Sequence, residues 1–166
     1  MKQKGFTLIE VLVALAISGM LMVGIVLSIF QVSWGNIRTN DHITALTDVN
    51  YAALWLKKDI QMAQDTSLTD GIPQSSVTLT WTDFTSFEEG NKNHSSSYAL
   101  SPGTTNLTRT YDGTPRVIGR QITSIGFTQD GKVINVAITA TGPGAFQRTK
   151  TLEFSVNVVM RPEELQ

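Results

Sequence analysis

A long apolar run lies near the N-terminus of the chain. Residues 11–30 are almost wholly apolar, and residues 11–37 contain no charged side chain. Twenty helical residues at about 1.5 Å each extend about 30 Å, which is the thickness of the hydrocarbon core of a bilayer. The run therefore predicts a helix that crosses a membrane.

The flanking charges predict an orientation for this helix. Lys2 and Lys4 precede the apolar run, and no Lys or Arg follows it before Arg38. This bias places the N-terminus in the cytoplasm and the rest of the chain outside. A removed signal peptide is disfavoured because the cleavage-like tripeptide Ala-Leu-Ala at 14–16 lies inside the run. A plain signal anchor stays open, whereas a buried helix of a soluble domain would be shorter and less uniformly apolar.

Helical periodicity continues beyond the apolar run. Apolar residues recur in steps of three and four at Leu46, Val49, Ala53, Leu56, Ile60 and Ala63. Such spacing makes one continuous stripe on a helix. Because no proline occurs before Pro73, the pattern predicts a single helix from about residue 6 to about residue 65.

After Pro73 the pattern changes to alternation, which is typical of strands with one apolar face. Strands are predicted at 77–82, 106–111, 122–128, 134–140 and 152–160. Asp130-Gly131 predicts a hairpin, residues 141–144 predict another turn, and residues 87–97 predict a polar loop. The fold class is therefore α+β: a long N-terminal transmembrane and amphipathic helix packed on a C-terminal antiparallel β-sheet, in the form of a lollipop.

Composition narrows the chemistry. The net charge is −1 and the chain has no cysteine, which excludes disulfides and thiolate chemistry. His42 and His94 lack metal-ligand spacing and are expected to be solvated, His42 on the helix and His94 in the polar loop. Asp112-Gly113 and Asp130-Gly131 are explained as turns rather than calcium sites. No enzyme, metal or cofactor is expected.

The hexapeptide Gly5-Phe6-Thr7-Leu8-Ile9-Glu10, with Lys4 before it and an apolar helix after it, resembles the N-terminal processing motif of type IV pilins and pseudopilins. The resemblance implies that a prepilin peptidase cuts between Gly5 and Phe6 and methylates the new amine of Phe6. Thr7 is expected to cap the helix or to lie near the peptidase.

Glu10 is the unusual residue of the motif, because a carboxylate at the edge of an apolar helix is costly when it is unpaired. After cleavage it can pair with the amine of Phe6 on a neighbouring subunit, and a paired charge is tolerated in an apolar bundle. Glu10 is therefore the predicted assembly salt bridge.

The resemblance also implies a domain order and partners. Residues 1–5 form the leader, 6–35 the assembly helix, 36–68 its amphipathic second half, and 69–166 a β head. Residues 51–63 are similar to J-type pseudopilins and PilW-like minor pilins. The expected partners are the prepilin peptidase, other pilin subunits bound through the N-terminal helix, an inner-membrane assembly platform, and membrane lipid before assembly. The single-pass precursor would enter a pilus or pseudopilus for secretion, including type II secretion, motility, adhesion or DNA uptake.

Two alternatives remain open. The chain could be an unprocessed, membrane-anchored extracytoplasmic binding module. It could also touch DNA directly at a pilus tip, through a patch of Arg109, Arg116 and Arg120, although the near-neutral charge disfavours this.

Overall fold

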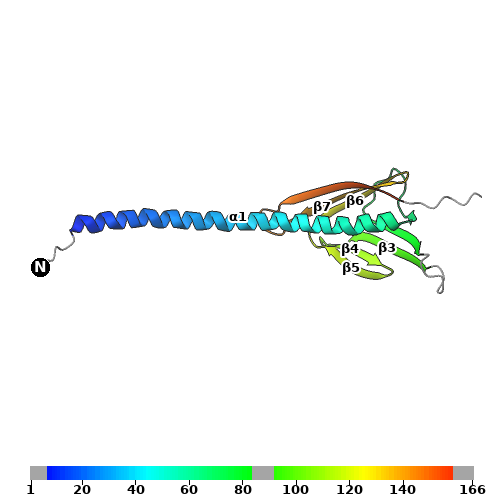
Figure 1. Cartoon of the computed structure of the whole chain (residues 1–166), viewed down its shortest axis with the longest axis horizontal. Coiled ribbons are helices and arrows are strands. Elements are labelled where there is room, and N and C mark those ends of the chain that lie inside the picture. Colours follow the sequence, from blue (N-terminus) through cyan, green and yellow to red (C-terminus); the bar gives the residue numbers. More distant parts are fainter. Residues whose placement is uncertain (1–6, 84–91, 159–166) are drawn as a thin grey trace, which may run out of the picture.

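A single helix, α1 (Leu8–Met62), runs for 55 residues from the N-terminal end of the chain into the head. The computed structural model describes residues 7–83 and 92–158. At about 1.5 Å per residue, α1 is about 82 Å long. Its N-terminal half projects beyond the sheets and its C-terminal half lies among them (Figure 1). The long helix expected from periodicity is confirmed, with ends at residues 8 and 62.

Within residues 7–83 and 92–158, eight strands form the head. The first sheet holds β1 (Asp65–Thr66), β2 (Val77–Asp83), β3 (Lys92–Leu100), β4 (Leu107–Tyr111) and β5 (Thr114–Gly119), in chain order. The second sheet holds β6 (Ile122–Asp130), β7 (Val133–Thr141) and β8 (Thr149–Asn157), also in chain order. Every pair of neighbouring strands is antiparallel.

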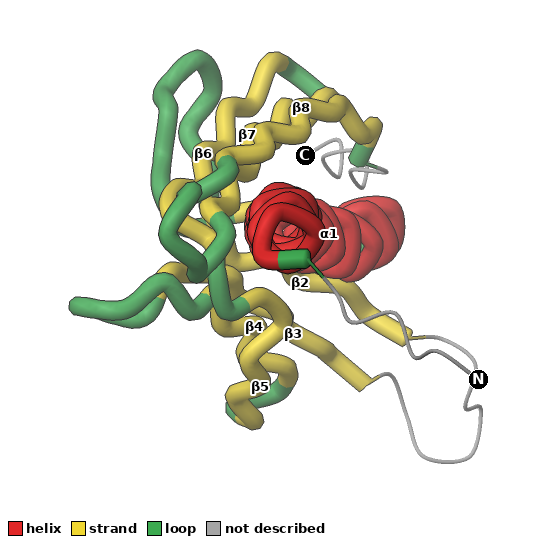
Figure 2. Tube along the Cα trace, turned by 90° about the vertical axis from the view of Figure 1, so that its left-hand side faces the viewer, coloured by secondary structure: helices red, strands yellow, loops and turns green. Residues whose placement is uncertain are grey.

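The helix lies between the two sheets, with β6–β8 on one side and β2–β5 on the other (Figure 2). Its buried apolar residues in the head are Ala45, Val49, Ala52, Ala53, Leu56 and Ile60. They pack with the inner side chains of both sheets in one hydrophobic cluster. Because α1 contributes to both interfaces, it forms the centre of the core. The α+β lollipop is thus the observed architecture.

The single sheet expected from the alternating pattern is instead two sheets. Between β5 and β6, the backbone N–H groups of Arg120 and Gln121 donate to Asp48 Oδ2 on the helix, at 3.2 and 2.9 Å. These groups are therefore bound to a side chain of α1 at the point where the chain leaves the first sheet for the second. Alternation alone does not carry this information, because strands of one sheet and of two sheets show the same period.

The polar loop expected at residues 87–97 is also partly wrong. From Lys92 onward this segment is β3, which pairs with β2 and β4, while residues 84–91 lie outside the described part of the chain. The strand is polar because several of its side chains bond to other side chains of the head, and these contacts are invisible in the local sequence. The hairpin at Asp130-Gly131 is confirmed, with Gly131 at φ 55°.

The turn between β7 and β8 is confirmed and packs tightly on the helix. Asp41 of α1 is 2% exposed, and its Oδ1 accepts the N–H of Gly144 at 3.0 Å. A β-carbon built at Gly142 would lie 2.4 Å from the backbone oxygen of Asp41. Glycine is therefore required at position 142 so that the turn can approach the helix backbone.

We expect Gly142→Ala to lower the free energy of unfolding by about 1–3 kcal/mol, because the added methyl group overlaps the backbone of α1. The measurement is urea unfolding of the full-length protein in detergent, followed by tryptophan fluorescence. Gly126→Ala is the matched control, since nothing lies within 4 Å of a β-carbon at that position. Equal urea midpoints for the two variants would contradict the close approach.

Candidate functional site

The N-terminus of α1 is closed by a reciprocal cap. Thr7 is the N-cap residue, with an extended backbone at φ −78° and ψ 150°. Its Oγ1 accepts the N–H of Glu10 at 3.4 Å, and Glu10 Oε2 accepts the N–H of Thr7 at 2.9 Å. Glu10 Oε2 also accepts the hydroxyl of Thr7 at 2.8 Å. This capping box satisfies donors that would otherwise be unpaired at the helix start, so the expected capping role of Thr7 is confirmed.

The cap leaves part of the Glu10 carboxylate unused. All the contacts that the carboxylate makes with described residues use Oε2, and none uses Oε1. One oxygen therefore remains able to accept a hydrogen bond from outside the chain. Gly5 and Phe6 lie outside the described residues, so cleavage between them, methylation of Phe6 and its pairing with Glu10 stay predictions.

The N-terminal half of α1 is apolar on every face and has no cover from the head. Between residues 8 and 37, the large apolar side chains are exposed by 46% to 87%. The helix is long and apolar enough to cross a membrane. Large apolar surfaces of this kind are normally buried in lipid or against other proteins. Trp34 is 63% exposed and lies against the ring of Phe30, with 6.4 Å between the centroids.

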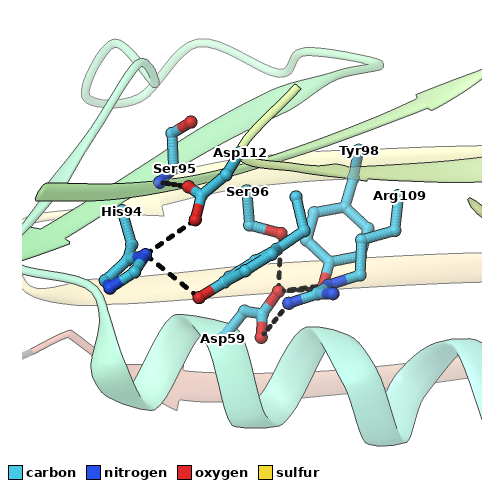
Figure 3. A network of polar contacts seen from close by, with 8 residues as sticks. Asp59, His94, Ser95, Ser96, Tyr98, Arg109 and Asp112 are labelled. Atoms are coloured by element: carbon cyan, nitrogen blue, oxygen red, sulfur yellow. Dashed lines mark hydrogen bonds and ion pairs between the residues drawn. The ribbon is translucent and has the colours of Figure 1, made fainter. Parts of the chain in front are cut away.

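At the other end of α1, a buried carboxylate joins the helix to the first sheet. Asp59 has no exposed surface. Its Oδ2 accepts the hydroxyls of Ser96, at 2.6 Å, and of Tyr98, at 2.5 Å. Arg109 Nε donates to Oδ2 at 2.7 Å, and Arg109 Nη2 donates to Oδ1 at 3.1 Å. The four donors converge on Asp59 from β3 and β4 (Figure 3).

The environment of this network keeps each donor protonated. Burial, together with the hydrogen bond and negative charge of Asp59, raises the pKa of Tyr98 well above its usual range. Burial alone would lower the pKa of Arg109, but its hydrogen bond and ion pair with Asp59 raise it above the usual value. Both groups therefore stay donors throughout the physiological pH range, and the buried charge on Asp59 stays compensated.

Aromatic rings surround the cation of this pair. The guanidinium of Arg109 lies 4.8 Å from the ring centroid of Trp55 and 4.7 Å from that of Tyr111. Trp81 and His94 extend the group, with each centroid about 6 Å from that of Tyr111. Cation–π contacts of this kind hold the guanidinium plane in place. Arg109 is therefore held in a structural ion pair and is not a free member of the hypothetical basic patch of Arg109, Arg116 and Arg120.

The expectation for His94 is wrong, because the residue is in a strand and its ring is packed. It stacks on Tyr111 with 5.7 Å between centroids, and its Nδ1 lies 2.7 Å from Asp112 Oδ2. Asp112 Oδ1 accepts the N–H of Ser95 at 2.8 Å. Partial burial would raise the pKa of Asp112, but Ser95 and His94 hold it below its usual value. Asp112 also begins the β4–β5 turn, at φ 46°, as the turn interpretation of Asp112-Gly113 requires.

His42 is exposed on α1, as expected. Within residues 7–83 and 92–158, no three His, Cys, Asp or Glu side chains gather as a metal site would require.

Sequence reasoning missed the aspartates that hold the head on the helix. A helical stripe contains them in steps of four, three, four, four and three: Asp41, Ala45, Asp48, Ala52, Leu56 and Asp59. Acids placed on an apolar stripe are a usable signal, since a buried carboxylate needs donors from elsewhere in the fold. The pattern indicates such contacts but does not identify the donors.

Comparison with known proteins adds one finding. The protein-family profile for the prokaryotic N-terminal methylation motif matches residues 1–26. No curated protein and no solved structure matches the chain. The motif supports a type IV pilin-like protein that is processed by a prepilin peptidase and assembles with other pilins, which are structural subunits. Together with the apolar helix, it suggests membrane anchoring.

We expect Asp59→Asn to lower the free energy of unfolding by about 3–5 kcal/mol, because it leaves the guanidinium of Arg109 unpaired among aromatic rings. Urea unfolding of the full-length protein in detergent measures the change. Asp130→Asn, at an exposed aspartate in the β6–β7 hairpin, is the matched control and is expected to change stability by less than about 0.5 kcal/mol.

A double variant separates loss of the ion pair from loss of packing. Asp59→Asn combined with Arg109→Gln removes both charges, so it is expected to cost less than the sum of the two single substitutions. If the double variant loses as much unfolding free energy as the two single variants together, the two residues are not a coupled pair.

Proposed function

We propose that this chain is a minor pilin or pseudopilin, cut between Gly5 and Phe6, methylated at Phe6, and drawn from the membrane into a filament. The observation that carries the proposal is the combination of the methylation motif at residues 1–26 with an exposed apolar helix that continues to residue 37. The motif supplies a processing site, and the helix supplies a surface that needs lipid or other helices.

The helix and the head of such a subunit have different locations. Residues 6–35 enter the membrane and later the filament core. Residues 36–68 form the amphipathic second half of the helix and lead into the first strand, and residues 69–166 supply the rest of the head outside the membrane. The N-terminus lies in the cytoplasm, as the positions of Lys2 and Lys4 favour. The similarity of residues 51–63 supports placement near J-type pseudopilins and PilW-like minor pilins.

Glu10 is the residue on which assembly depends. In a bundle of apolar helices its charge needs a partner, and the amine of Phe6 on a neighbouring subunit supplies one. Oε1 of Glu10 makes no contact with the described residues, which supports this role, because the carboxylate can keep its cap to Thr7 while it accepts a second contact. A correctly placed neighbour is then favoured over one displaced along the helix axis.

The first test is the mass of the intact protein and its N-terminal peptide, taken from its native membrane in cells that hold an active prepilin peptidase. We expect a chain that begins at Phe6 and carries one additional methyl group. A chain that still begins at Met1 would reject processing and favour the unprocessed, membrane-anchored binding module.

The second test addresses assembly. Glu10→Gln is expected to leave processing intact and to lower the amount of the subunit in sheared filaments by at least about tenfold, because the amine of its neighbour loses its charged partner. Glu153→Gln makes the same chemical change at an exposed position in β8 and is expected to assemble normally. Equal incorporation of the two variants would contradict the role of Glu10.

A further inference from the structure

A basic hollow lies where the helix enters the head. Arg38, Thr39 and His42 of α1 line it, together with Arg148 from the segment between β7 and β8, and its volume is about 320 Å³. Arg38 and His42 are exposed, and Arg148 is half-buried. Three basic side chains thus share one small depression on the surface.

These basic groups have no partner within the described part of the chain. Arg38, His42 and Arg148 make no side-chain hydrogen bond or ion pair there, in contrast to Arg109, which is held by Asp59. The nearest acid along the helix is Asp41, whose carboxylate is buried and accepts the N–H of Gly144. The hollow therefore presents positive charge to the solvent, and no acidic side chain of the described residues lines it.

The fold builds this hollow from distant parts of the sequence. The glycine turn after β7 packs on Asp41, and the N–H of Gly142 donates to the carbonyl of Arg148 at 2.9 Å. These contacts fix Arg148 beside the helix turn that carries Arg38. The same segment carries Phe146, which is 46% exposed and lies two residues before Arg148 in the sequence.

The position of the hollow along α1 matches the thickness of a bilayer. The β7–β8 turn lies at the end of the head nearest to the projecting half of α1 (Figure 1). Residues 8–37 extend about 45 Å at about 1.5 Å each, and a bilayer with its headgroups is about 40–45 Å thick. When Glu10 lies at one headgroup layer, Arg38 reaches the other. The exposed rings of Phe30 and Trp34 precede it within the last turns of the apolar run, where interfacial aromatics are common.

We propose that the hollow lined by Arg38, His42 and Arg148 binds the phosphate of an anionic phospholipid headgroup on the outer face of the membrane, before the subunit is assembled. Guanidinium groups suit phosphate because they donate paired hydrogen bonds along with their charge. Basic residues next to a membrane-spanning helix are attracted to anionic lipid. The inference rests on the proposed function only in that α1 spans a membrane. The bound lipid holds the head at a fixed height, and its release accompanies extraction of the subunit.

The test is native mass spectrometry of the full-length protein in an uncharged detergent, with phosphatidylglycerol or phosphatidylcholine added at equal concentration. The wild-type protein is expected to retain phosphatidylglycerol preferentially. Arg38→Gln combined with Arg148→Gln is expected to lower retention of phosphatidylglycerol by about tenfold, to the level of phosphatidylcholine. Arg148→Gln alone is expected to lose part of the preference without changing the helix.

Arg116→Gln combined with Arg120→Gln is the matched control, because it removes two exposed arginines elsewhere on the head. It is expected to retain the wild-type preference. Equal retention of the two lipids by the wild-type protein, or wild-type retention by the Arg38 and Arg148 variant, would overturn the proposal.

Inorganic phosphate distinguishes the source of the phosphate group. We expect a tenfold excess of phosphate over lipid to leave phosphatidylglycerol bound, because the acyl chains stay beside the apolar helix. Displacement by phosphate would identify a site for free anions and would overturn the lipid assignment. The assay does not depend on cleavage at Gly5, so its failure leaves the processing result intact, and failure of processing leaves the lipid result intact.

Discussion

The buried carboxylate of Asp59 is the contact on which the arrangement of helix and head depends. An ionised group without solvent must find donors or raise the energy of the fold. Asp59 finds four, from Ser96, Tyr98 and Arg109, and all of them belong to the first sheet. Apolar packing is non-directional, whereas hydrogen bonds and ion pairs require a defined geometry. A charge with four directed donors fixes one position, so this contact sets the register between α1 and the head.

Asp41 and Asp48 also attach the helix to the head through their carboxylates. Asp48 binds the backbone where the chain passes from the first sheet to the second, and Asp41 binds the turn of the second sheet. All three aspartates lie on the side of α1 that faces the head. Apart from Glu10, the N-terminal half of the helix has no charged side chain and is free to contact lipid or other helices. One helix thus combines a polar attachment to its own head with an apolar surface for external partners.

Particular residues show how far the sequence predicts this structure. The stripe from Val49 to Ala63 predicts the helix because its period is local. Asp130-Gly131 predicts a hairpin because glycine accepts the positive φ that the turn requires, and Gly131 adopts it. The division into two sheets is not predictable from alternation, since strands of one sheet and of two sheets show the same period. The sequence of β3 resembles a polar loop because its polar side chains find their hydrogen-bond partners only in the folded head. At the N-terminal site, Thr7 acts as the expected cap, while the roles of Gly5, Phe6 and Glu10 in processing and assembly stay predictions.

The helix also has a mechanical property, because it runs from the Thr7 cap to Met62 without a proline or a break in its hydrogen bonding. Over about 82 Å, a tilt of one degree at the N-terminal end displaces the far end by about 1.4 Å. Asp59 and its donors clamp the head near that far end, so little of this motion is absorbed on the way. The chain is therefore a stiff lever, in which a small rotation imposed on its apolar end becomes a large sideways movement of its head.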